Sequence, residues 1–389
     1  MTLRIRPEIA AIESEIIAIR RDIHLHPELG FEEHRTAALV AKKLRSMGIR
    51  VQEKIGKTGV VGDLEGKYAG PTIALRADMD ALPIQETGDA SYKSKCDGVM
   101  HACGHDGHTA ILLGVAKVLS EKRRYLHGRL RFIFQPSEEK DGGATYMIDD
   151  GCLDGVDEIY GIHLWNYSAF GEIGSRPGAI LAATDSLKIL VKGVGGHGAM
   201  PQGTVDAIVV SSNLVNALQT VVSRNIDPLQ NAVITIGTIH GGDNHNVIAS
   251  SVNMEGTIRT FSEDIARQIR DRIYQIANGV QTAFGATIEV NIESGYPATM
   301  NDPNLYKKVM TAAKKVASEG ARLITPFMGG EDFAYYAEKV PGCFFFIGSS
   351  PGGKPPGTIP HHCSNFDFDE RALLVGASVL LELVESSMV

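Results

Sequence analysis

The sequence predicts an α/β fold with a mostly parallel sheet, interrupted by a smaller inserted α+β domain. The chain has 389 residues, which at roughly 150 residues per domain corresponds to two or three domains. In its first and last parts, short aliphatic runs alternate with helical stretches, an order typical of a parallel sheet covered by helices. In the middle, the order of the elements changes to one typical of a two-layer α+β domain.

The first part of the chain supplies most of the predicted parallel sheet. Aliphatic residues at three- and four-residue spacing predict amphipathic helices, and uninterrupted aliphatic runs predict buried strands. The expected elements are helices at 9–24 and 36–47, a strand at 72–76, a helix at 110–119, and strands at 130–135 and 158–164.

The inserted part has the strand and helix order βαββαβ, which is the ferredoxin-like layout. Its expected elements are strands at 186–193, 232–240, 251–261 and 287–294, with helices at 206–223 and 263–284. The earlier alternation then resumes with a helix at 304–316, a strand at 343–348 and a helix at 370–387. We therefore expect residues 1–184 and 297–389 to form one domain, with residues 185–296 inserted in it.

Composition and charge exclude several classes of protein. Lys and Arg number 38 against 46 Asp and Glu, a net charge of −8, which argues against nucleic acid or an anionic membrane as the main partner. No apolar run of about 18 residues could span a bilayer, and residues 1–21 lack the apolar core of a signal peptide, so we expect a cytoplasmic protein. The five cysteines are an odd number and scattered, which leaves metal binding, catalysis or burial as their roles.

Polar side chains lie at the end of three of the predicted strands or just after it. Because ligands of open α/β sheets bind outside the carboxyl ends of the strands, we expect these side chains at one edge of the sheet. They are Asp78, Asp80, Glu138, Glu139 and His163.

The segment HACGHDGH, residues 101–108, is dense in metal-binding side chains. Cys103 and His105 can chelate one ion from a loop, since thiolate and imidazole are usual transition-metal donors. The glycines of the segment let the backbone fold tightly around an ion. The alternative is a polar turn that caps the following helix through Asp106 or Thr109.

The adjacent carboxylates Glu138 and Glu139 suit metal-assisted hydrolysis. One of them can bind an ion while the other takes the proton from the attacking water. A solvated acidic turn that continues into Lys140 and Asp141 is the alternative.

Residues 193–198, GVGGHG, match the G-x-G-x-x-G pattern of dinucleotide-binding loops. Pro201 and Gly203 interrupt the position where the helix would begin, and no acidic residue closes a second strand about 20 positions later, so this reading fails. The loop is better suited to hold His197 at a close-approach position, with an ordinary surface histidine as the alternative.

Two further groups are weaker candidates. His361 and His362 follow a proline-rich loop and become candidate ligands only if the earlier donors lack one. Asn246 and Arg259 lie in the inserted domain, where a role for Arg259 in gripping a carboxylate is a hypothesis.

Together these residues resemble the metal-dependent aminoacylase/carboxypeptidase family, specifically its hippurate hydrolase and indole-acetyl-amino-acid hydrolase branch. The matching segments span nearly the whole chain in family order. They are RRDIHLHPELGFEE (20–33), LRADMDALPIQE (75–86), MHACGHDGHTA (100–110), FQPSEE (134–139), GIHLWN (161–166), GGHGAMPQ (195–202), NVIA (246–249), GTIRT (256–260), GGEDFAYY (329–336) and HHCSNFDFDE (361–370).

The resemblance implies a zinc-peptidase-like catalytic domain with an inserted lid. Asp80 would support a ligand from behind, and Asp78 stands where other branches carry a histidine ligand. Glu138 would be the general base, and His197 would reach from the lid to the scissile carbonyl. The implied metal ligands are Cys103, His105, Glu139, His163 and His362, and the implied substrate-binding residues are Asn246 and Arg259.

The choice of His362 over His361 rests on its four-residue spacing to Phe366. The branch often has a proline two residues after the last histidine, where this chain has Ser364.

The implied activity is metal-dependent hydrolysis of the amide bond of a small-molecule N-acyl-L-amino acid, with one or two Zn, Mn, Co or Ni ions per subunit. Dipeptide carboxypeptidase, N-carbamoyl-amino-acid hydrolase, and a metal-binding protein without turnover are alternatives. Relatives often associate through the lid, which makes a homo-oligomer an option, and His197 would then serve its own or a neighbouring subunit's site.

Overall fold

The computed structural model describes residues 2–352 and 354–389, which divide into two compact units. The first unit extends to Ile180 and also contains Thr299–Thr325 and Asp332–Val389. The second unit comprises Leu181–Ala298 and the short segment Pro326–Glu331. The functional division into a catalytic domain and a lid remains a prediction.

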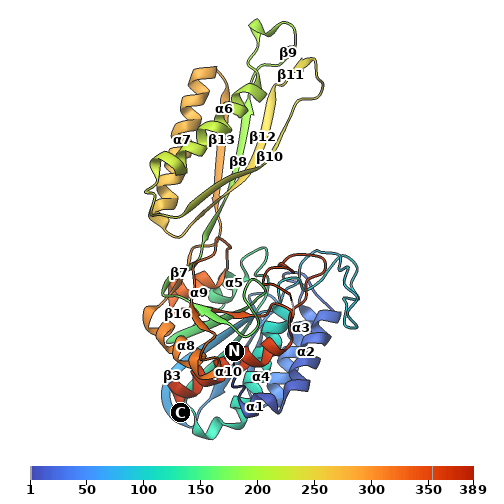
Figure 1. Ribbon diagram of the computed structural model, residues 1–389, viewed down its shortest axis with the longest axis vertical. Coiled ribbons are helices and arrows are strands. Elements are labelled where there is room, and N and C mark those ends of the chain that lie inside the picture. Colours follow the sequence, from blue (N-terminus) through green and yellow to red (C-terminus); the bar gives the residue numbers. More distant parts are fainter. Residues whose placement is uncertain (1, 353) are drawn as a thin grey trace. The chain divides into compact units, whose positions relative to one another are not determined.

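The first unit is built on an eight-stranded sheet with the strand order β1-β2-β4-β3-β5-β16-β6-β15 (Figure 1). Its central strands β4, β3, β5 and β16 run parallel, while β1, β2 and β6 join antiparallel neighbours. The predicted mostly parallel sheet is therefore confirmed. The strands are β1 (Arg50–Ile55), β2 (Gly59–Glu65), β3 (Tyr68–Asp78), β4 (His127–Gln135), β5 (Glu158–Trp165), β6 (Ile173–Ser175), β15 (Ala321–Leu323) and β16 (Gly342–Gly348), with β7 (Gly178–Leu181) and β14 (Thr299–Asn301) forming a separate pair.

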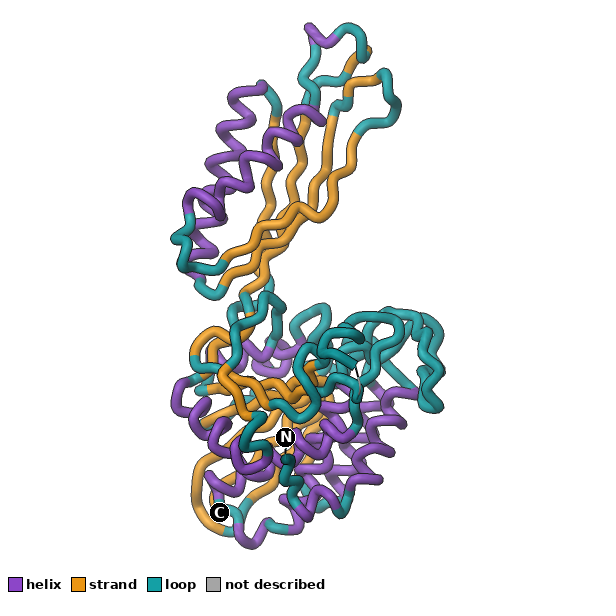
Figure 2. The backbone as a smooth tube through the Cα atoms, viewed as in Figure 1, coloured by secondary structure: helices purple, strands orange, loops and turns teal. Residues whose placement is uncertain are grey.

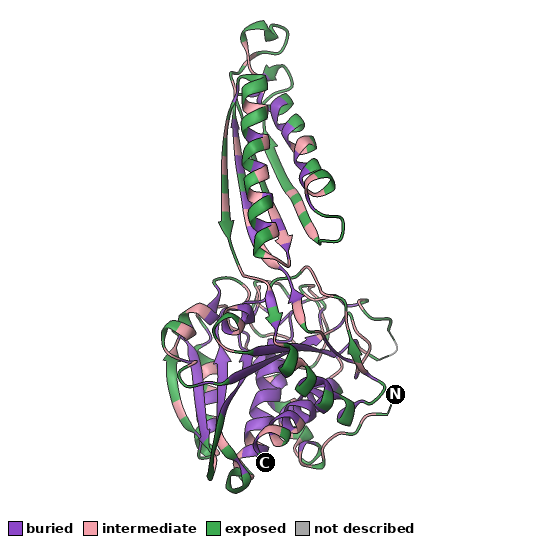
Figure 3. Cartoon of the chain, turned by 90° about the vertical axis from the view of Figure 1, so that its left-hand side faces the viewer, coloured by how far each residue is buried: buried purple, intermediate pink, exposed green. Residues whose placement is uncertain are grey.

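Helices bury the central strands of this sheet. Every residue of β16 is buried, and β5 is buried up to Leu164 (Figure 3). Strands that are covered on both faces need apolar residues at successive positions, which explains the aliphatic runs in the sequence. Helices α4 and α10 are themselves core elements that pack against each other and the sheet. The helices are α1 (Pro7–Ala10), α2 (Glu13–Leu25), α3 (His34–Ser46), α4 (His105–Glu121), α5 (Gly143–Asp149), α8 (Pro303–Val316), α9 (Phe333–Lys339) and α10 (Arg371–Met388), with a 3-10 turn at Arg123–Tyr125.

The second unit has the predicted βαββαβ order. Its antiparallel sheet has the order β10-β12-β8-β13, and α6 and α7 lie side by side over one face (Figure 2). A separate ribbon pairs β9 (Gly196–His197) with β11 (Val247–Ile248). The main elements are β8 (Ala183–Lys192), α6 (Ala207–Thr220), β10 (Ala232–Gly241), β12 (Ser251–Thr260), α7 (Glu263–Phe284) and β13 (Thr287–Ser294), with a 3-10 turn at Pro201–Gly203 and a π turn at Val221–Asn225.

Two expectations about local structure are wrong. Helix α4 begins at His105 rather than at residue 110, and its cap is Gly104 in the left-handed conformation, with φ of 96°. The alternative of a turn capped by Asp106 or Thr109 therefore fails, because both residues lie inside the helix. The helix expected at 9–24 is broken after Ala10 into α1 and α2.

The sequence did not predict β1, β2 and β6. The six residues of β1 are exposed or half-buried and mostly polar, so they offer no aliphatic run to recognise. Within the described residues, no helix combines the length and apolar character needed to cross a membrane.

Candidate metal centre

Four segments of the first unit bring the predicted donors to one edge of its sheet. Cys103 ends the loop before α4, and His105 opens that helix. His163 lies near the carboxyl end of β5. Glu139 follows β4 at the same end, and His362 lies in the loop before α10 with a left-handed φ of 62°.

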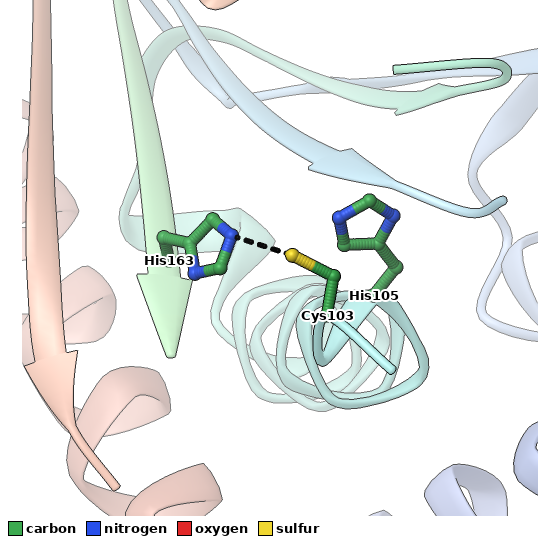
Figure 4. A group of neighbouring side chains, drawn as sticks. All are labelled: Cys103, His105 and His163. Atoms are coloured by element: carbon green, nitrogen blue, oxygen red, sulfur yellow. Dashed lines mark hydrogen bonds between the residues drawn. The ribbon is translucent and has the colours of Figure 1, made fainter. Parts of the chain in front are cut away.

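Cys103 lies at the centre of this group. Its Sγ is 3.4 Å from Nε2 of His163 and 3.3 Å from Nε2 of His362. Figure 4 shows the side chains of Cys103, His105 and His163, which come from the start of α4 and from the neighbouring strand β5. Ligand atoms of these three residues all lie within 4.8 Å of one another.

Glu139 connects the remaining donors. Its Oε1 lies 3.1 Å from Nε2 of His362 and 3.9 Å from Nε2 of His105. Two ligands at typical zinc distances on one tetrahedral ion are about 3.5 Å apart, so these separations suit donors that share a cation.

The donor atoms are also oriented for a cation. Nδ1 of His105 lies 2.9 Å from the Asp80 carbonyl oxygen, and Nδ1 of His163 lies 2.5 Å from the carbonyl oxygen of Leu164. These Nδ1 hydrogen bonds direct Nε2 of each ring at the cluster, as in most metal-binding histidines.

Two of these donor atoms are left without a hydrogen bond. Among the described residues, Nε2 of His105 and Oε1 of Glu139 are buried and have no partner with hydrogen-bond geometry, although Oε1 of Glu139 lies close to Nε2 of His362. A buried polar atom without a partner is unfavourable, and a divalent cation would satisfy both atoms. The residues therefore fit a metal centre with mixed sulfur, nitrogen and oxygen donors.

The electrostatics of the cluster agree with this fit. Burial, together with the carboxylates of Glu139 and Glu138, raises the pKa of the Cys103 thiol well above its usual value. Burial would lower the pKa of His105, but Asp78, Asp80 and Glu139 raise it to about 10. The site thus concentrates negative charge, which a divalent cation neutralises.

Asp80 supports two of the ligands. Besides accepting from His105, it accepts a hydrogen bond of 3.0 Å from the backbone N–H of Glu139. These contacts suit the supporting role that the resemblance implies for Asp80, and that role stays a prediction.

Asp78 lies behind the cluster, paired with His108. Its Oδ1 is 2.6 Å from Nδ1 of His108, and its Oδ2 accepts a 2.6 Å hydrogen bond from Arg76. Nε2 of His108 accepts the Leu164 N–H at 2.9 Å, so both ring nitrogens of His108 are used. Asp78 and His108 therefore buttress the site from within the protein.

The two adjacent histidines of the C-terminal loop have different surroundings. Nε2 of His361 accepts the backbone N–H of Asn166 at 3.1 Å, and its ring stacks on Trp165 at 4.9 Å. Burial, with a contribution from His362, lowers the pKa of His361 to about 3. The structure thus brings His362, and not His361, to Cys103 and Glu139.

Glu138 borders the cluster from the loop after β4. Its side chain is buried, and one carboxylate oxygen lies within 4.8 Å of a ring nitrogen of His105 and an oxygen of Glu139. The adjacent carboxylates therefore stand beside the other donors, as a ligand and a base require.

The residues predicted in the second unit do not form one group. His197, in β9, pairs with Val247, and its Nδ1 accepts the Ala199 N–H at 3.1 Å, which leaves Nε2 to carry the proton. Asn246 is next to this ribbon, and its carbonyl oxygen accepts the Gly198 N–H at 2.8 Å. Both side chains are exposed.

Arg259 lies in β12 of the four-stranded sheet, at the end of that sheet opposite to the β9–β11 ribbon. It pairs with Thr184 at the start of β8, whereas the β9–β11 ribbon lies beyond Lys192 at the end of β8 (Figure 1). Thr184 and Lys192 are eight residue steps apart along β8, a distance of about 26 Å. His197 and Arg259 of one chain are therefore far apart.

Sequence reasoning missed the residues that hold the donor loops. Arg20, on α2, is fully buried and pairs with Asp106, Asp367 and Glu370, which flank the α4 and His362 segments. Glu33 is also buried and accepts the N–H of Ser137, next to Glu138. Both residues lie in segment 20–33, one of the segments that carry the family resemblance. This resemblance could have indicated them, although it assigned no role to either residue.

Comparison with known proteins identifies the family. Residues 74–386 match the peptidase family M20/M25/M40. YhaA of Bacillus subtilis is 46% identical over 94% of this chain and 93% of that protein. Thermostable carboxypeptidase 2 of Saccharolobus solfataricus is 43% identical, and N-acetyl-L-cysteine deacetylase of B. subtilis is 42% identical. Each covers 96% of this chain, and the alignments span 95% and 88% of those proteins, respectively.

Solved structures are similar along the whole chain. A protein of methicillin-resistant Staphylococcus aureus has a TM-score of 0.90 at 36% identity over 98% of both chains. The YXEP protein of B. subtilis, described as a dinuclear metal binding peptidase, has a TM-score of 0.84 at 35% identity over 96% of this chain and 98% of that chain. The chain belongs to peptidase family M20/M25/M40, in its amidohydrolase branch. It is a hydrolase, so the alternative of a metal-binding protein without turnover is dropped.

Proposed function

We propose that the protein hydrolyses the amide bond of N-acyl-L-amino acids and releases a carboxylic acid and a free amino acid. One observation carries the proposal. Five potential metal ligands that are distant in the chain converge within a few ångströms of one another, next to the buried carboxylate of Glu138. The five are Cys103, His105, Glu139, His163 and His362.

The five donors are proposed to hold one or two divalent cations. Thiolate, imidazole and carboxylate ligands suit Zn, and also Mn, Co or Ni. When bound, such cations supply Lewis acidity, which lowers the pKa of water and polarises an amide carbonyl.

Glu138 is the proposed general base. It takes the proton from the attacking water and returns it to the leaving amine, so that one carboxylate serves both half-reactions. Its burial keeps bulk water away from the carboxylate, which strengthens its interaction with the reacting groups.

His197 is the proposed donor to the developing oxyanion. The Ala199 N–H occupies its Nδ1, so the protonated Nε2 is available as a hydrogen-bond donor. We expect His197→Ala to lower kcat about 100-fold and to leave metal content unchanged, measured by steady-state kinetics and metal analysis. Loss of metal would contradict this assignment, because His197 belongs to the second unit.

Asn246 and Arg259 are the proposed substrate-binding residues. Arg259 makes no ion pair among the described residues, which leaves its guanidinium available to bind a carboxylate of the substrate. Since Arg259 and His197 of one chain lie far apart, a small substrate that touches both would need two copies of the chain. A homo-oligomer is therefore part of the proposal.

Relatives favour two classes of amide substrate. The deacetylase at 42% identity supports N-acetyl-amino acids or related N-acyl-amino acids such as hippurate. The carboxypeptidase at 43% identity supports a second candidate, dipeptides with a free carboxylate. Both share an amide bond next to a carboxylate.

A substrate panel on metal-reconstituted protein tests the proposal. Protein loaded separately with Zn, Mn, Co and Ni would be assayed with hippurate, N-acetyl-Met, N-acetyl-Cys, an N-carbamoyl-amino acid and dipeptides. We expect metal-dependent release of free amino acid, fastest with an N-acyl-amino acid. Faster dipeptide cleavage would select the carboxypeptidase alternative, and absence of amide hydrolysis with every metal would overturn the proposal.

A further inference from the structure

Glu33 is a fully buried carboxylate to which the proposed reaction gives no role. It directly precedes α3, yet its side chain does not cap that helix. Glu28 does this instead, because its carboxylate accepts the backbone N–H groups of Arg35 at 2.7 Å and Thr36 at 2.8 Å. The carboxylate of Glu33 is thus directed elsewhere.

Both oxygens of Glu33 reach across to other loops. Oε1 accepts the backbone N–H of Ser137 at 2.9 Å, and Oε2 accepts the hydroxyl of Thr58 at 2.5 Å. Burial raises the pKa of Glu33 to about 7, which reflects the unfavourable free energy of a charge in this place. An ionisable group retained at such a cost suggests a role beyond filling space.

Ser137 immediately precedes Glu138 and has an unusual backbone. Its φ is 50°, in the left-handed region that non-glycine residues rarely adopt. Its own hydroxyl has no hydrogen-bond partner among residues 2–352 and 354–389, so the side chain does not hold this conformation. The hydrogen bonds are on the backbone: the N–H donates to Glu33, and the carbonyl accepts the Gly143 N–H at 2.9 Å.

The surroundings leave Ser137 little freedom. A Cβ placed on Gly30 would lie 2.5 Å from Oγ of Ser137, so the segment that carries Glu33 packs directly on this residue. On the other side of Glu138, the Glu139 N–H donates to Asp80. The backbone amides on both sides of Glu138 are therefore each fixed by a buried carboxylate.

We propose that Glu33 is a positioning residue, which holds Ser137 in its left-handed conformation and thereby aims the carboxylate of Glu138 at the reacting water. This inference rests on the proposed function of Glu138 as the general base. Asp80 also contacts the ligand His105, whereas the hydrogen bonds of Glu33 go to Thr58 and Ser137. Loss of Glu33 should therefore affect the base and not the metal.

Four variants separate positioning from mere stabilisation. Glu33→Ala removes the acceptor. Glu33→Asp shortens the side chain by one methylene and keeps the carboxylate, so it serves as the test if the alanine variant fails to fold. Glu33→Gln keeps an acceptor oxygen for Ser137. Thr58→Val is the matched control, since it removes the other hydrogen bond of Glu33. For each variant, kcat, KM and bound metal would be measured well below the melting temperature.

We expect kcat to fall about 10- to 100-fold in Glu33→Ala and Glu33→Asp, with KM and metal content near those of the wild type. Glu33→Gln should recover most of kcat, and Thr58→Val should stay within about threefold of the wild type. A kcat within twofold of the wild type in the alanine or aspartate variant would overturn the inference. So would metal loss in these variants, or an equal decrease in Thr58→Val.

Glu138→Gln, assayed on the same substrate, distinguishes failure of the proposed function from failure of the role proposed for Glu33. If Glu138→Gln keeps its activity, the proposed function itself fails. If Glu138→Gln is inactive and Glu33→Ala is active, only the role of Glu33 fails.

Discussion

The two units present their candidate residues in opposite ways. In the first unit, Cys103, His105 and His163 are buried, and their geometry is fixed by hydrogen bonds and packing within that unit. In the second unit, His197 and Asn246 are exposed, and no donor group of the same kind surrounds them within the described part of that unit.

This difference separates two kinds of catalytic contribution. A cation and a general base need positions defined to a fraction of an ångström, which a closed core provides. A residue that meets the substrate only when it binds can stand on an exposed ribbon. Variants of the buried donors of the first unit should therefore change metal binding, whereas variants of the exposed residues His197 and Asn246 should change turnover and leave metal binding unchanged.

The largest effect is expected at Glu138. Glu138→Gln should lower kcat about 10³- to 10⁴-fold and leave metal content unchanged, since the base is lost while the ligands stay. Kinetics and metal analysis on the same preparation measure both quantities. Glu139→Gln is the matched control and should lose metal. Near-normal turnover in metal-loaded Glu138→Gln would exclude it as the base.

A pair of arginines compares the stability of the units. Arg20 is fully buried between Asp106, Asp367 and Glu370, so Arg20→Met should lower the free energy of unfolding by about 3–5 kcal/mol. Arg270, which pairs with Asp185 in the second unit, is partly exposed, and Arg270→Met should lose about 1 kcal/mol. Urea denaturation measures both values, and equal losses would contradict the contrast between the two units.

The C-terminal histidines give a comparison within one loop. His362→Ala should weaken metal binding about 100-fold, because the ring lies against Cys103 and Glu139. His361→Ala should leave metal affinity within about threefold of the wild type, since Nε2 of His361 accepts the Asn166 N–H and its ring stacks on Trp165. Titration with a chelating indicator tests this pair, and the reverse order of affinities would reassign the ligand.

The smallest effect is a pH dependence at Glu33. Its pKa is raised to about 7 in the folded protein, so its contribution to stability is present below about pH 4.5 and is lost as the pH rises through 7. From pH 5 to pH 8 the wild type should therefore lose about 2 kcal/mol relative to Glu33→Gln, which carries no charge. Denaturant titrations of both proteins at the two pH values give this difference. Parallel pH profiles would show that Glu33 keeps an ordinary pKa.

The sequence predicts the metal centre better than the residues that support it. Glu138, Glu139 and His163 could be assigned to one edge because the carboxyl ends of parallel strands meet there. The contact between Glu33 and Ser137 joins residues 104 positions apart, and no periodicity or spacing indicates it. The left-handed conformation of Ser137 is equally hidden, since nothing in its residue type demands it.

In the second unit, the sequence predicts the order of the elements well but not the distances between the candidate residues. Its βαββαβ order, and the bounds of α7 and β13, follow directly from the alternation of apolar residues. A motif does not tell how far apart its members lie, however. The separation of His197 from Arg259 along the sheet could be measured only in the folded unit.

Anomalous X-ray diffraction from crystals saturated with zinc or manganese would locate the proposed cations. We expect one or two anomalous peaks, each about 2.0–2.3 Å from its ligands, among Cys103, His105, Glu139, His163 and His362. The carboxylate of Glu138 should lie next to the metal ions without being one of their ligands. Absence of any anomalous peak among these five side chains at saturating metal would show that they do not form a metal centre.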